Sequence, residues 1–474
     1  MSDAAALLAD RFRASASKAL LVREDGTELS YAQVWTNAKR IADGWKAQGI
    51  APGATVAIVL RNDPSILACY LACLIGGFVA APINPELGEA DVAFILTMMR
   101  PSVTLTDAPP LETQARPADD WSIASDPAAI GAVFFTSGTT GRPKGVRHSW
   151  NSLVGNVVSF NAMMVLDEGT RLYHVMPMTY MAGFLNTMLS PVMAGGTIVL
   201  GPRFSAQSAL DFWIRPRETG ANTMWLSPSM AASLCRTNRD PAAARAAAAG
   251  FATVLCGTAP LHNGVRQAFR ATFGAALQES YGTSELLLIS AQRHADAETA
   301  TDVGSLLPEL AIRARPNADG QPELTVRSPF AYLGYVTEQG IVPADLDQGY
   351  MPTGDMGELF DGRLRITGRI KDLIIRGGVN IAPVTLENAL AGLPGLEDVA
   401  VVSLPHEYWG ESIIVCIQPV PGADAAQLEQ DVRARCREKL ARSHQPDRIA
   451  ILDRFPRAPT GKVQKHQLRT MLAA

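Results

Sequence analysis

The sequence predicts an α/β protein in which a large, multi-layer N-terminal domain with mostly parallel sheets precedes a small, mobile α+β domain. Two observations predict this organisation. Over the first three-quarters of the chain, short β-branched runs alternate with segments whose apolar residues recur at helical spacing, which is typical of βαβ units. The pattern changes at residue 369, where a stretch of roughly 105 residues begins that is long enough to fold alone. We therefore expect domains at residues 1–368 and 369–474.

The first elements follow from local patterns. Residues 29–50 carry apolar side chains at helical spacing, and residues 54–60 form a β-branched run typical of a strand. The longest apolar run, residues 66–81, is shorter than the roughly 20 residues that a membrane span needs. Gly76 and Gly77 also interrupt it. We expect a buried helix followed by a buried strand there, and no membrane span.

The later elements are expected in the same way. Apolar runs of strand length lie at residues 170–177, 196–201, 222–228, 251–257 and 323–329. The Ala-rich segment 241–250 favours a surface helix, because Ala is the best helix former. In the C-terminal domain we expect a helix at 384–393, two apolar strands after it, and a basic helix at about 427–441.

Composition excludes several classes of protein. The 474 residues include 42 basic and 46 acidic side chains, so the net charge of −4 argues against a nucleic-acid binder. A hydrophobic content of 47% is ordinary for a folded domain and excludes disorder. The six cysteines form no CxxC pair, and the N-terminus lacks a signal-peptide pattern, so we expect a soluble cytoplasmic protein with reduced thiols.

The strongest functional signal is the segment Thr136–Gly145, TSGTTGRPKG, which follows an apolar strand. Its glycines allow a polyphosphate to approach the backbone, its hydroxyls and N–H groups donate to phosphate oxygens, and Lys144 adds positive charge. It is not a Walker loop, because Gly145 follows the lysine where Ser or Thr is required. The alternative is an exposed Gly/Thr turn. The expected phosphate contacts are Thr136, Ser137, Gly138, Thr139, Thr140, Gly141 and Lys144.

This segment resembles the phosphate-binding signature of the adenylate-forming superfamily, which includes acyl-CoA synthetases, adenylation domains and luciferases. Five further motifs resemble that family in the same order along the chain. They are CGTAPL with YGTSE, the TGD element, a crossover segment and a C-terminal PxGK element, at residues 256–261, 281–285, 353–355, 368–378 and 459–465. The resemblance covers nearly the whole chain and extends to the N-terminal segments.

The resemblance implies roles for individual residues. Tyr281 would pack on adenine, with Gly282 beside it, while the Ser284 hydroxyl would touch the α-phosphate. Glu285 would serve Mg²⁺, together with Thr136. The backbone of Gly257, Thr258 and Ala259 would lie against adenine.

For the remaining motifs, the resemblance implies that Asp355 and Arg369 bind the ribose. Lys371 would be the hinge between the domains. Lys462 would cross to the active site as a catalytic residue, and the small domain would rotate between two half-reactions. Gly377 and Gly378 would leave space for the thiol arm.

The implied activity is ATP- and Mg²⁺-dependent formation of an acyl-adenylate and pyrophosphate, followed by thioester formation with coenzyme A. Two alternatives stay open: a ligase that loads a carrier-protein thiol in trans, and an inactive nucleotide-binding protein. Formation of a homodimer also stays open. His148, just beyond the loop, is the one histidine of interest, although a core role is commoner for such a residue.

Residues 172–189, which follow the loop, contain no Asp, Glu, Lys or Arg. Burying an unpaired ammonium or carboxylate there costs several kcal/mol, so amino acids and dicarboxylates are disfavoured as substrates. We expect an uncharged fatty or aromatic acid. The expected acyl pocket consists of Tyr180, Met181, Phe184, Met224, Trp225, Cys256 and Leu286.

Overall fold

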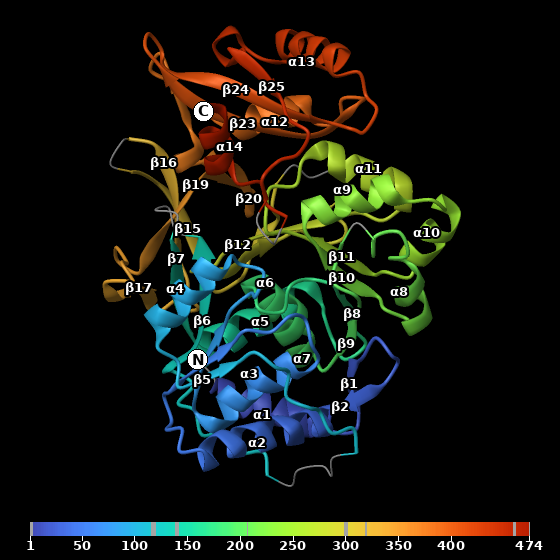
Figure 1. Ribbon diagram of the computed structural model, residues 1–474, viewed down its shortest axis with the longest axis vertical. Helices are drawn as coiled ribbons and strands as arrows, with labels where there is room; N and C mark the ends of the chain where they lie inside the picture. The colour runs from blue at the N-terminus through green and yellow to red at the C-terminus, as the bar shows by residue number, and fades with distance from the viewer. Residues whose placement is uncertain are drawn as a thin grey trace.

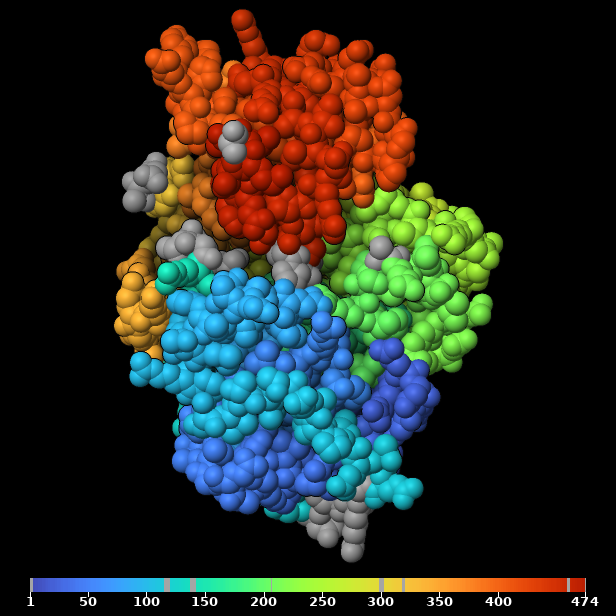
Figure 2. Space-filling model, viewed as in Figure 1, coloured from blue at the N-terminus to red at the C-terminus, as the bar shows by residue number. Residues whose placement is uncertain are grey.

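The computed structural model describes residues 3–114, 120–137, 142–205, 207–297, 302–317, 320–457 and 461–473. It has a large body and, at one end, a smaller body formed by the C-terminal part of the chain (Figure 1). The two bodies are in contact in the space-filling view (Figure 2).

The largest sheet of the described residues has thirteen strands in the order β15-β16-β19-β20-β14-β13-β12-β11-β10-β8-β9-β1-β2. Pairing is parallel from β12 to β1 and antiparallel elsewhere, so the sheet is mixed, with βαβ units in its middle. Its strands are β1 (Ala19–Val22), β2 (Glu28–Ser30), β8 (Arg171–His174), β9 (Thr197–Leu200), β10 (Thr223–Leu226), β11 (Thr253–Cys256), β12 (Gln278–Thr283), β13 (Leu287–Ala291), β14 (Ser305–Leu306), β15 (Ala311–Pro316), β16 (Pro322–Arg327), β19 (Tyr350–Phe360) and β20 (Arg363–Arg369).

The second sheet has seven strands in the order β18-β17-β7-β6-β4-β3-β5. Its β3, β4, β5 and β6 are parallel, and the hairpins β6–β7 and β17–β18 are antiparallel. The strands are β3 (Thr55–Ile58), β4 (Val79–Pro82), β5 (Val103–Leu105), β6 (Ile130–Ser137), β7 (Pro143–Ser149), β17 (Gly334–Thr337) and β18 (Gly340–Pro343).

Helices cover these sheets. The long apolar run of the sequence forms the helix α3 (Ser65–Gly76) and most of the strand β4. Every residue of α3 is buried, which explains why that helix has no polar face. Among the described residues, no helix is both long and apolar enough to cross a membrane. The helices of the large body are α1 (Ala4–Ala14), α2 (Tyr31–Ala47), α3 (Ser65–Gly76), α4 (Glu89–Met99), α5 (Trp150–Met164), α6 (Met181–Phe184), the π-helix η1 (Leu185–Leu189), α7 (Ser190–Ala194), α8 (Ile214–Thr219), α9 (Pro228–Thr237), α10 (Pro241–Ala248) and α11 (Asn263–Phe273).

The small domain has its own five-stranded sheet, with two apolar clusters on its two faces. Alternate residues of β23 supply them: Val401 packs toward α12 and α13, while Val402 packs toward α14. Its elements are the 3₁₀-helix η2 (Ile370–Asp372), β21 (Ile374–Arg376), β22 (Val379–Ile381), α12 (Pro383–Leu390), β23 (Leu396–His406), β24 (Gly410–Pro419), α13 (Ala425–Lys439), the 3₁₀-helix η3 (Arg442–His444), β25 (Arg448–Ile451) and α14 (Lys465–Ala473).

The α/β class and the small α+β unit are confirmed, and the Ala-rich segment forms α10 as expected. The sheets are less parallel than the sequence suggested, because antiparallel hairpins extend both of them. The boundary expected after Gly368 falls one residue before the end of β20, so Arg369 still belongs to a strand of the large sheet.

Candidate active site

The predicted phosphate segment lies at the end of the β6–β7 hairpin. Thr136 is paired directly with Lys144 across the two antiparallel strands, so their side chains lie on the same face. The Thr136 hydroxyl is buried and has no hydrogen-bond partner among the described residues. Such an orphaned hydroxyl is available to a ligand. Gly138, Thr139, Thr140 and Gly141 lie outside the described residues, as does the side chain of Ser137.

Lys144 belongs to a cluster with Glu285 and Tyr335. The lysine Nζ lies 3.4 Å from Glu285 Oε1 and 3.7 Å from the centre of the Tyr335 ring. The Tyr335 hydroxyl donates to the same carboxylate oxygen over 2.7 Å. Burial, and next the Glu285 charge, raise the pKa of Tyr335 far above its usual value, so this hydroxyl keeps its proton. One carboxylate is thereby oriented by two donors from two other strands.

Tyr335 is the functional candidate that the sequence analysis missed. It lies on β17, which pairs with β7 so that Tyr335 is opposite Val146, two residues from Lys144. The segment LGYVT has no chemical signature, and only the strand pairing brings it to the site.

A second cluster forms around Asp355, whose exposed fraction is only 1%. Arg369 lies directly opposite Asp355 on β19 and β20, and its Nε donates to Asp355 Oδ1 over 2.6 Å. The Tyr281 hydroxyl donates to Asp355 Oδ2 over 2.7 Å. Burial and the Asp355 charge raise the pKa of Tyr281 well above its usual value. Three of the predicted nucleotide residues are therefore in direct contact.

The segment after β11 makes a close backbone approach. A Cβ at Gly257 would lie 2.5 Å from Ser280 Oγ, and Thr258 adopts a positive φ of 74° that few non-glycine residues tolerate. A Cβ at Gly282 would lie 2.2 Å from the Leu287 carbonyl oxygen. Ala259 continues the same turn. This strained segment offers backbone rather than side chains to a planar ligand.

His148 acts on the neighbouring motif from within the core. Its Nε2 donates to the Ser284 carbonyl oxygen over 2.7 Å, and its side chain is fully buried. Burial lowers the pKa of His148 to about 4, so the ring is neutral. It holds the residue before Glu285 in place and carries no charge itself.

Lys462 comes from the small domain and approaches the Asp355 cluster. Desolvation, with the nearby Arg369 and Lys371 cations, lowers the pKa of Lys462 to about 8. The preceding Gly461 touches the large domain, because a Cβ there would lie 2.2 Å from Ser229 Oγ. The structure thus brings Lys462 near Arg369 and Asp355, the two residues that the resemblance assigns to the ribose.

Polar contacts join the small domain to the large domain. Arg236 pairs with Glu397 at 3.3 Å, and the His262 ring lies 2.9 Å from Asn388 Oδ1. Nearby, a Cβ at Gly264 would lie only 2.9 Å from the backbone nitrogen of Gly392.

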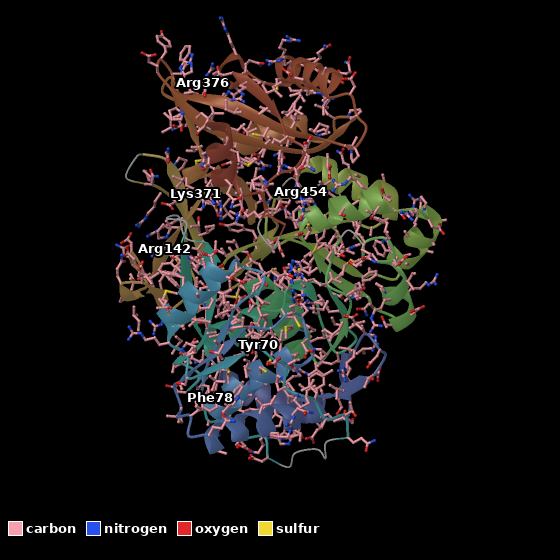
Figure 3. All side chains as sticks on the ribbon, viewed as in Figure 1. Tyr70, Phe78, Arg142, Lys371, Arg376 and Arg454 are labelled. Carbon is pink, nitrogen blue, oxygen red and sulfur yellow. The ribbon has the colours of Figure 1, made fainter. Side chains whose placement is uncertain are left out.

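The expected hinge and thiol residues lie around the start of the small domain. Figure 3 places Lys371 between the two bodies and Arg376 in the small domain. Arg376 pairs with Asp447 at 2.6 Å. Gly377 and Gly378 follow with positive φ angles of 57° and 79°. A Cβ would meet the Trp409 ring at Gly377 and nothing at Gly378.

The expected acyl-pocket residues do not lie together. Trp225 stacks on Phe160 of α5 at 5.4 Å, and consecutive residues of a strand point to opposite faces. Met224 therefore faces the other layer. Cys256 does so too, because it pairs in register with Leu226 and lies where the Glu279 and Arg266 charges act on it. The expectation of one pocket wall containing all three residues is corrected.

The other expected pocket residues are distributed between core and site. Phe184 stacks on Tyr70 at 4.1 Å within an aromatic core cluster. Met181 and Leu286 are buried. Tyr180 lies closer to the polar site, because Arg369 and Glu285 both act on its pKa, which burial raises.

The residues present fit a magnesium ion bound with a nucleotide. The described residues contain no group of three or more His, Cys, Asp or Glu side chains that could form an all-protein metal cage. Mg²⁺ instead favours one or two carboxylates, waters and substrate phosphates. Glu285 and the orphaned Thr136 hydroxyl supply suitable oxygen donors.

Comparisons with known proteins agree with this geometry. The model of the AMP-binding enzyme family matches residues 8–336, and that of the AMP-binding enzyme C-terminal domain matches residues 385–462. The chain is 30% identical to long-chain-fatty-acid–CoA ligase FadD13 of Mycobacterium tuberculosis, over 94% of this chain and 93% of that one. It is 30% identical to indoleacetate–CoA ligase of Aromatoleum aromaticum, over 95% of each. ATP-bound MatB from Rhodopseudomonas palustris has a TM-score of 0.87, 24% identity and 98% coverage of both chains.

Proposed function

The chain belongs to the AMP-binding enzyme family and is an AMP-forming acid–CoA ligase, and we propose that its acid is an uncharged fatty or aromatic monocarboxylate. One observation carries the proposed chemistry. Lys144 pairs with Glu285, Asp355 pairs with Arg369, and the charges of Arg369 and Asp355 act on Lys462 of the other domain, which supports one site at the domain boundary.

The first half-reaction needs positive charge and positioning. A carboxylate oxygen attacks the α-phosphorus of ATP, the bond to the β-phosphate oxygen breaks, and pyrophosphate leaves. Negative charge spreads over the phosphoryl oxygens, and fixed cations stabilise it. We propose that Lys462 bridges the carboxylate and the α-phosphate and that Lys144 holds the pyrophosphate, which the lysine charges support. Asp355 and Tyr281 orient the nucleoside.

Bound Mg²⁺ supplies Lewis-acid charge neutralisation on the phosphates, and Glu285 with Thr136 would hold it. Lys144 and Tyr335 donate to the Glu285 carboxylate. These same contacts fix where that carboxylate points.

In the second half-reaction the coenzyme A thiol attacks the acyl carbonyl, AMP leaves with the former carboxylate oxygen, and the thiol proton passes to solvent. Lys462 has no attacking carboxylate to hold in this step. We propose that the small domain turns about Lys371 between the half-reactions, bringing Gly377 and Gly378 to the thiol path.

We infer the class of acid from the residues near the expected acyl pocket rather than from the names of the relatives. One relative is named for a fatty acid and the other for an aryl acid, so their names leave the tail open. Residues 172–189 run from β8 through η1 and contain no Asp, Glu, Lys or Arg, and the charges of Arg369 and Glu285 act on Tyr180 within this stretch. A second charge on the acid would be buried without a partner.

Pyrophosphate release, measured with ATP, Mg²⁺ and a panel of acids, tests this function. We expect release with alkanoates or arylalkanoates and little with malonate or with amino acids. Comparable turnover of malonate would overturn the uncharged-acid proposal. Adding coenzyme A, or a purified carrier protein in its place, identifies the thiol. Absence of pyrophosphate with every acid would contradict the adenylation mechanism.

A further inference from the structure

A buried ion pair outside the clusters described above joins α11 to β12. Arg266 of α11 donates through Nη2 to Glu279 Oε2 over 2.7 Å. The two residues have exposed fractions of only 8% and 9%. Burial raises the pKa of Glu279 to about 7, against the opposing effect of the Arg266 charge. Such a pair is costly to bury, and apolar residues of similar volume often replace one without loss of stability. Stability alone therefore does not explain the pair.

The other carboxylate oxygen of Glu279 holds a backbone group beside the site. Its Oε1 accepts from the Leu261 N–H over 3.2 Å. Leu261 ends the strained turn of residues 257–261, and the Gly257 N–H at its start donates to the Leu226 carbonyl oxygen of β10 over 3.1 Å. The turn is thus tied to the sheet by a strand at its start and by a side chain at its end.

Arg266 and Gln292 fix the position of this carboxylate. The arginine Nη1 donates to the Leu277 carbonyl oxygen over 2.9 Å and to Gln292 Oε1 over 3.1 Å. The Glu279 N–H donates to the same Gln292 oxygen over 2.9 Å. Both the main chain and the side chain of Glu279 are therefore anchored, and the arginine that pairs with it is anchored as well.

The same strand leads from the ion pair to the nucleotide cluster. Glu279 and Tyr281 are two residues apart on β12, and Tyr281 donates to Asp355. β11 and β12 are parallel, with Cys256 beside Glu279, so the turn that follows β11 lies at the same edge of the sheet as Tyr281. Ligands of open α/β sheets bind at this carboxyl edge. Glu279 therefore acts on backbone that adjoins the nucleotide residues.

Backbone that is held in one orientation can distinguish bases. Adenine presents an amino donor at C6, whereas hypoxanthine presents a carbonyl acceptor at the same position. A fixed backbone carbonyl accepts from adenine and is repelled by hypoxanthine, because its lone pairs face another oxygen. A peptide group that is free to rotate can offer its N–H instead. The accuracy of base selection therefore depends on what holds the turn.

We propose that Glu279, held by Arg266, is a positioning residue that makes the enzyme select adenine over other bases by fixing the turn of residues 257–261. Both side chains act through the backbone. The inference rests on the proposed function, because it names the base specificity of the same nucleotide site.

Two matched double variants test this role, and both carry Arg266→Met so that no unpaired cation stays buried. The first adds Glu279→Gln, which keeps a side-chain oxygen that can accept from the Leu261 N–H. The second adds Glu279→Met, which is similar in length and uncharged but offers no such oxygen. Pyrophosphate release is measured with ATP, inosine triphosphate and 2′-deoxy-ATP, with the most active acid of the panel.

The expected difference lies in the choice of base. Wild-type kcat/KM should favour ATP over inosine triphosphate by about 100-fold or more, since a site that hydrogen-bonds a substrate group discriminates strongly. The variant with Glu279→Gln should keep this ratio within about threefold, and the variant with Glu279→Met should lower it by about tenfold, the effect of one well-made hydrogen bond. The preference for ATP over 2′-deoxy-ATP depends on the ribose contacts and should be the same in all three proteins.

The outcomes separate the two proposals. A wild-type ratio of ATP to inosine triphosphate near one would overturn this inference and leave the proposed function standing. Equal ratios in the two variants would overturn it too, and so would a parallel change in the 2′-deoxy-ATP preference, which a general loosening of the site would cause. No pyrophosphate with any acid would contradict the proposed function itself. If the variant with Glu279→Met fails to fold, Glu279→Leu with Arg266→Met gives the same comparison.

Discussion

The two halves of the site are built differently. In the large domain, Lys144 lies opposite Thr136 and Arg369 lies opposite Asp355 in direct strand register, so the sheet itself sets their geometry. Lys462 instead precedes α14 and reaches the site from a domain with its own core. The groups of the large domain are fixed within its sheets, whereas Lys462 reaches the site across the boundary between the two domains.

The difference teaches how such a site can be both accurate and adjustable. Groups that must match the nucleotide are held by strands, hydrogen bonds and burial, which resist displacement. The lysine depends on a few polar contacts between domains, such as Arg236 with Glu397. Contacts of that kind contribute little individually, so changing the domain orientation costs little.

The sharpest test of this contrast removes the side chain of Lys462, which the small domain contributes. Lys462→Ala should lower acyl-adenylate formation by about 10²–10³-fold, because a cation aimed at the transition state is lost. Conversion of supplied acyl-adenylate to thioester should stay near the wild-type rate. Separate measurement of pyrophosphate release and thioester formation checks this. Equal loss of both half-reactions would mean that the small domain does not serve them in two orientations.

A substitution in the large-domain half of the site should lower the adenylation rate less than Lys462→Ala does. Glu285→Gln keeps the shape but removes the charge that faces Lys144, and we expect a loss of adenylation of about 10–100-fold, as for other charge-assisted contacts. The Mg²⁺ dependence should weaken as well. Initial rates across a magnesium titration provide the measurement. Tyr335→Phe, which removes one donor to the same carboxylate, serves as the matched milder variant. Wild-type kinetics for Glu285→Gln at limiting Mg²⁺ would contradict the assignment.

A pH profile distinguishes the two halves without removing a side chain. The pKa of Lys462 is lowered to about 8, so its cation is present below that pH and is lost above it. We expect kcat/KM for adenylation to fall about tenfold per pH unit above pH 8, because this quantity reports the free enzyme. Thioester formation from acyl-adenylate should not share the fall. Lys462→Arg should move it to higher pH, since Arg stays charged. If kcat/KM of the Lys462→Arg variant falls at the same pH as that of the wild type, the group that titrates is not Lys462.

The smallest expected effect lies at the boundary itself. Glu397→Gln breaks the partly exposed pair with Arg236, a contact worth about 0–1 kcal/mol. The ratio of the two half-reaction rates should therefore change by less than about fivefold. Asp10→Asn, which breaks an exposed pair with Arg13 far from the boundary, is the control and should leave the ratio unchanged. A large effect of Glu397→Gln would show that the docked orientation is rate-determining.

The candidate nucleotide residues could be picked out from the sequence because each belongs to a short motif. Tyr281, Asp355 and Arg369 were expected together and are in contact. The alternation of β-branched runs with helical segments likewise predicted the α/β class. The motifs and the alternating pattern are both local features of the chain, and local features can be recognised in a single sequence.

Features that depend on strand pairing could not be predicted. Tyr335 reaches Glu285 only because β17 pairs with β7, two strands far apart in sequence. Met224 and Cys256 were expected in the acyl pocket beside Trp225, whereas register and alternation turn them to the opposite face from Trp225.

Arg369 ends β20 opposite Asp355, and η2 begins at the next residue. This adjacency determines where two relatives can be spliced. A chimera joined at Gly368 would take the carboxylate from one parent and the guanidinium from the other, whereas a crossover after Asp372 inherits both from one parent. A one-residue insertion within β20, between Arg363 and Arg369, would shift the register and separate the pair even though neither residue had changed. Recombination that exchanges small domains is therefore best tolerated at the end of η2.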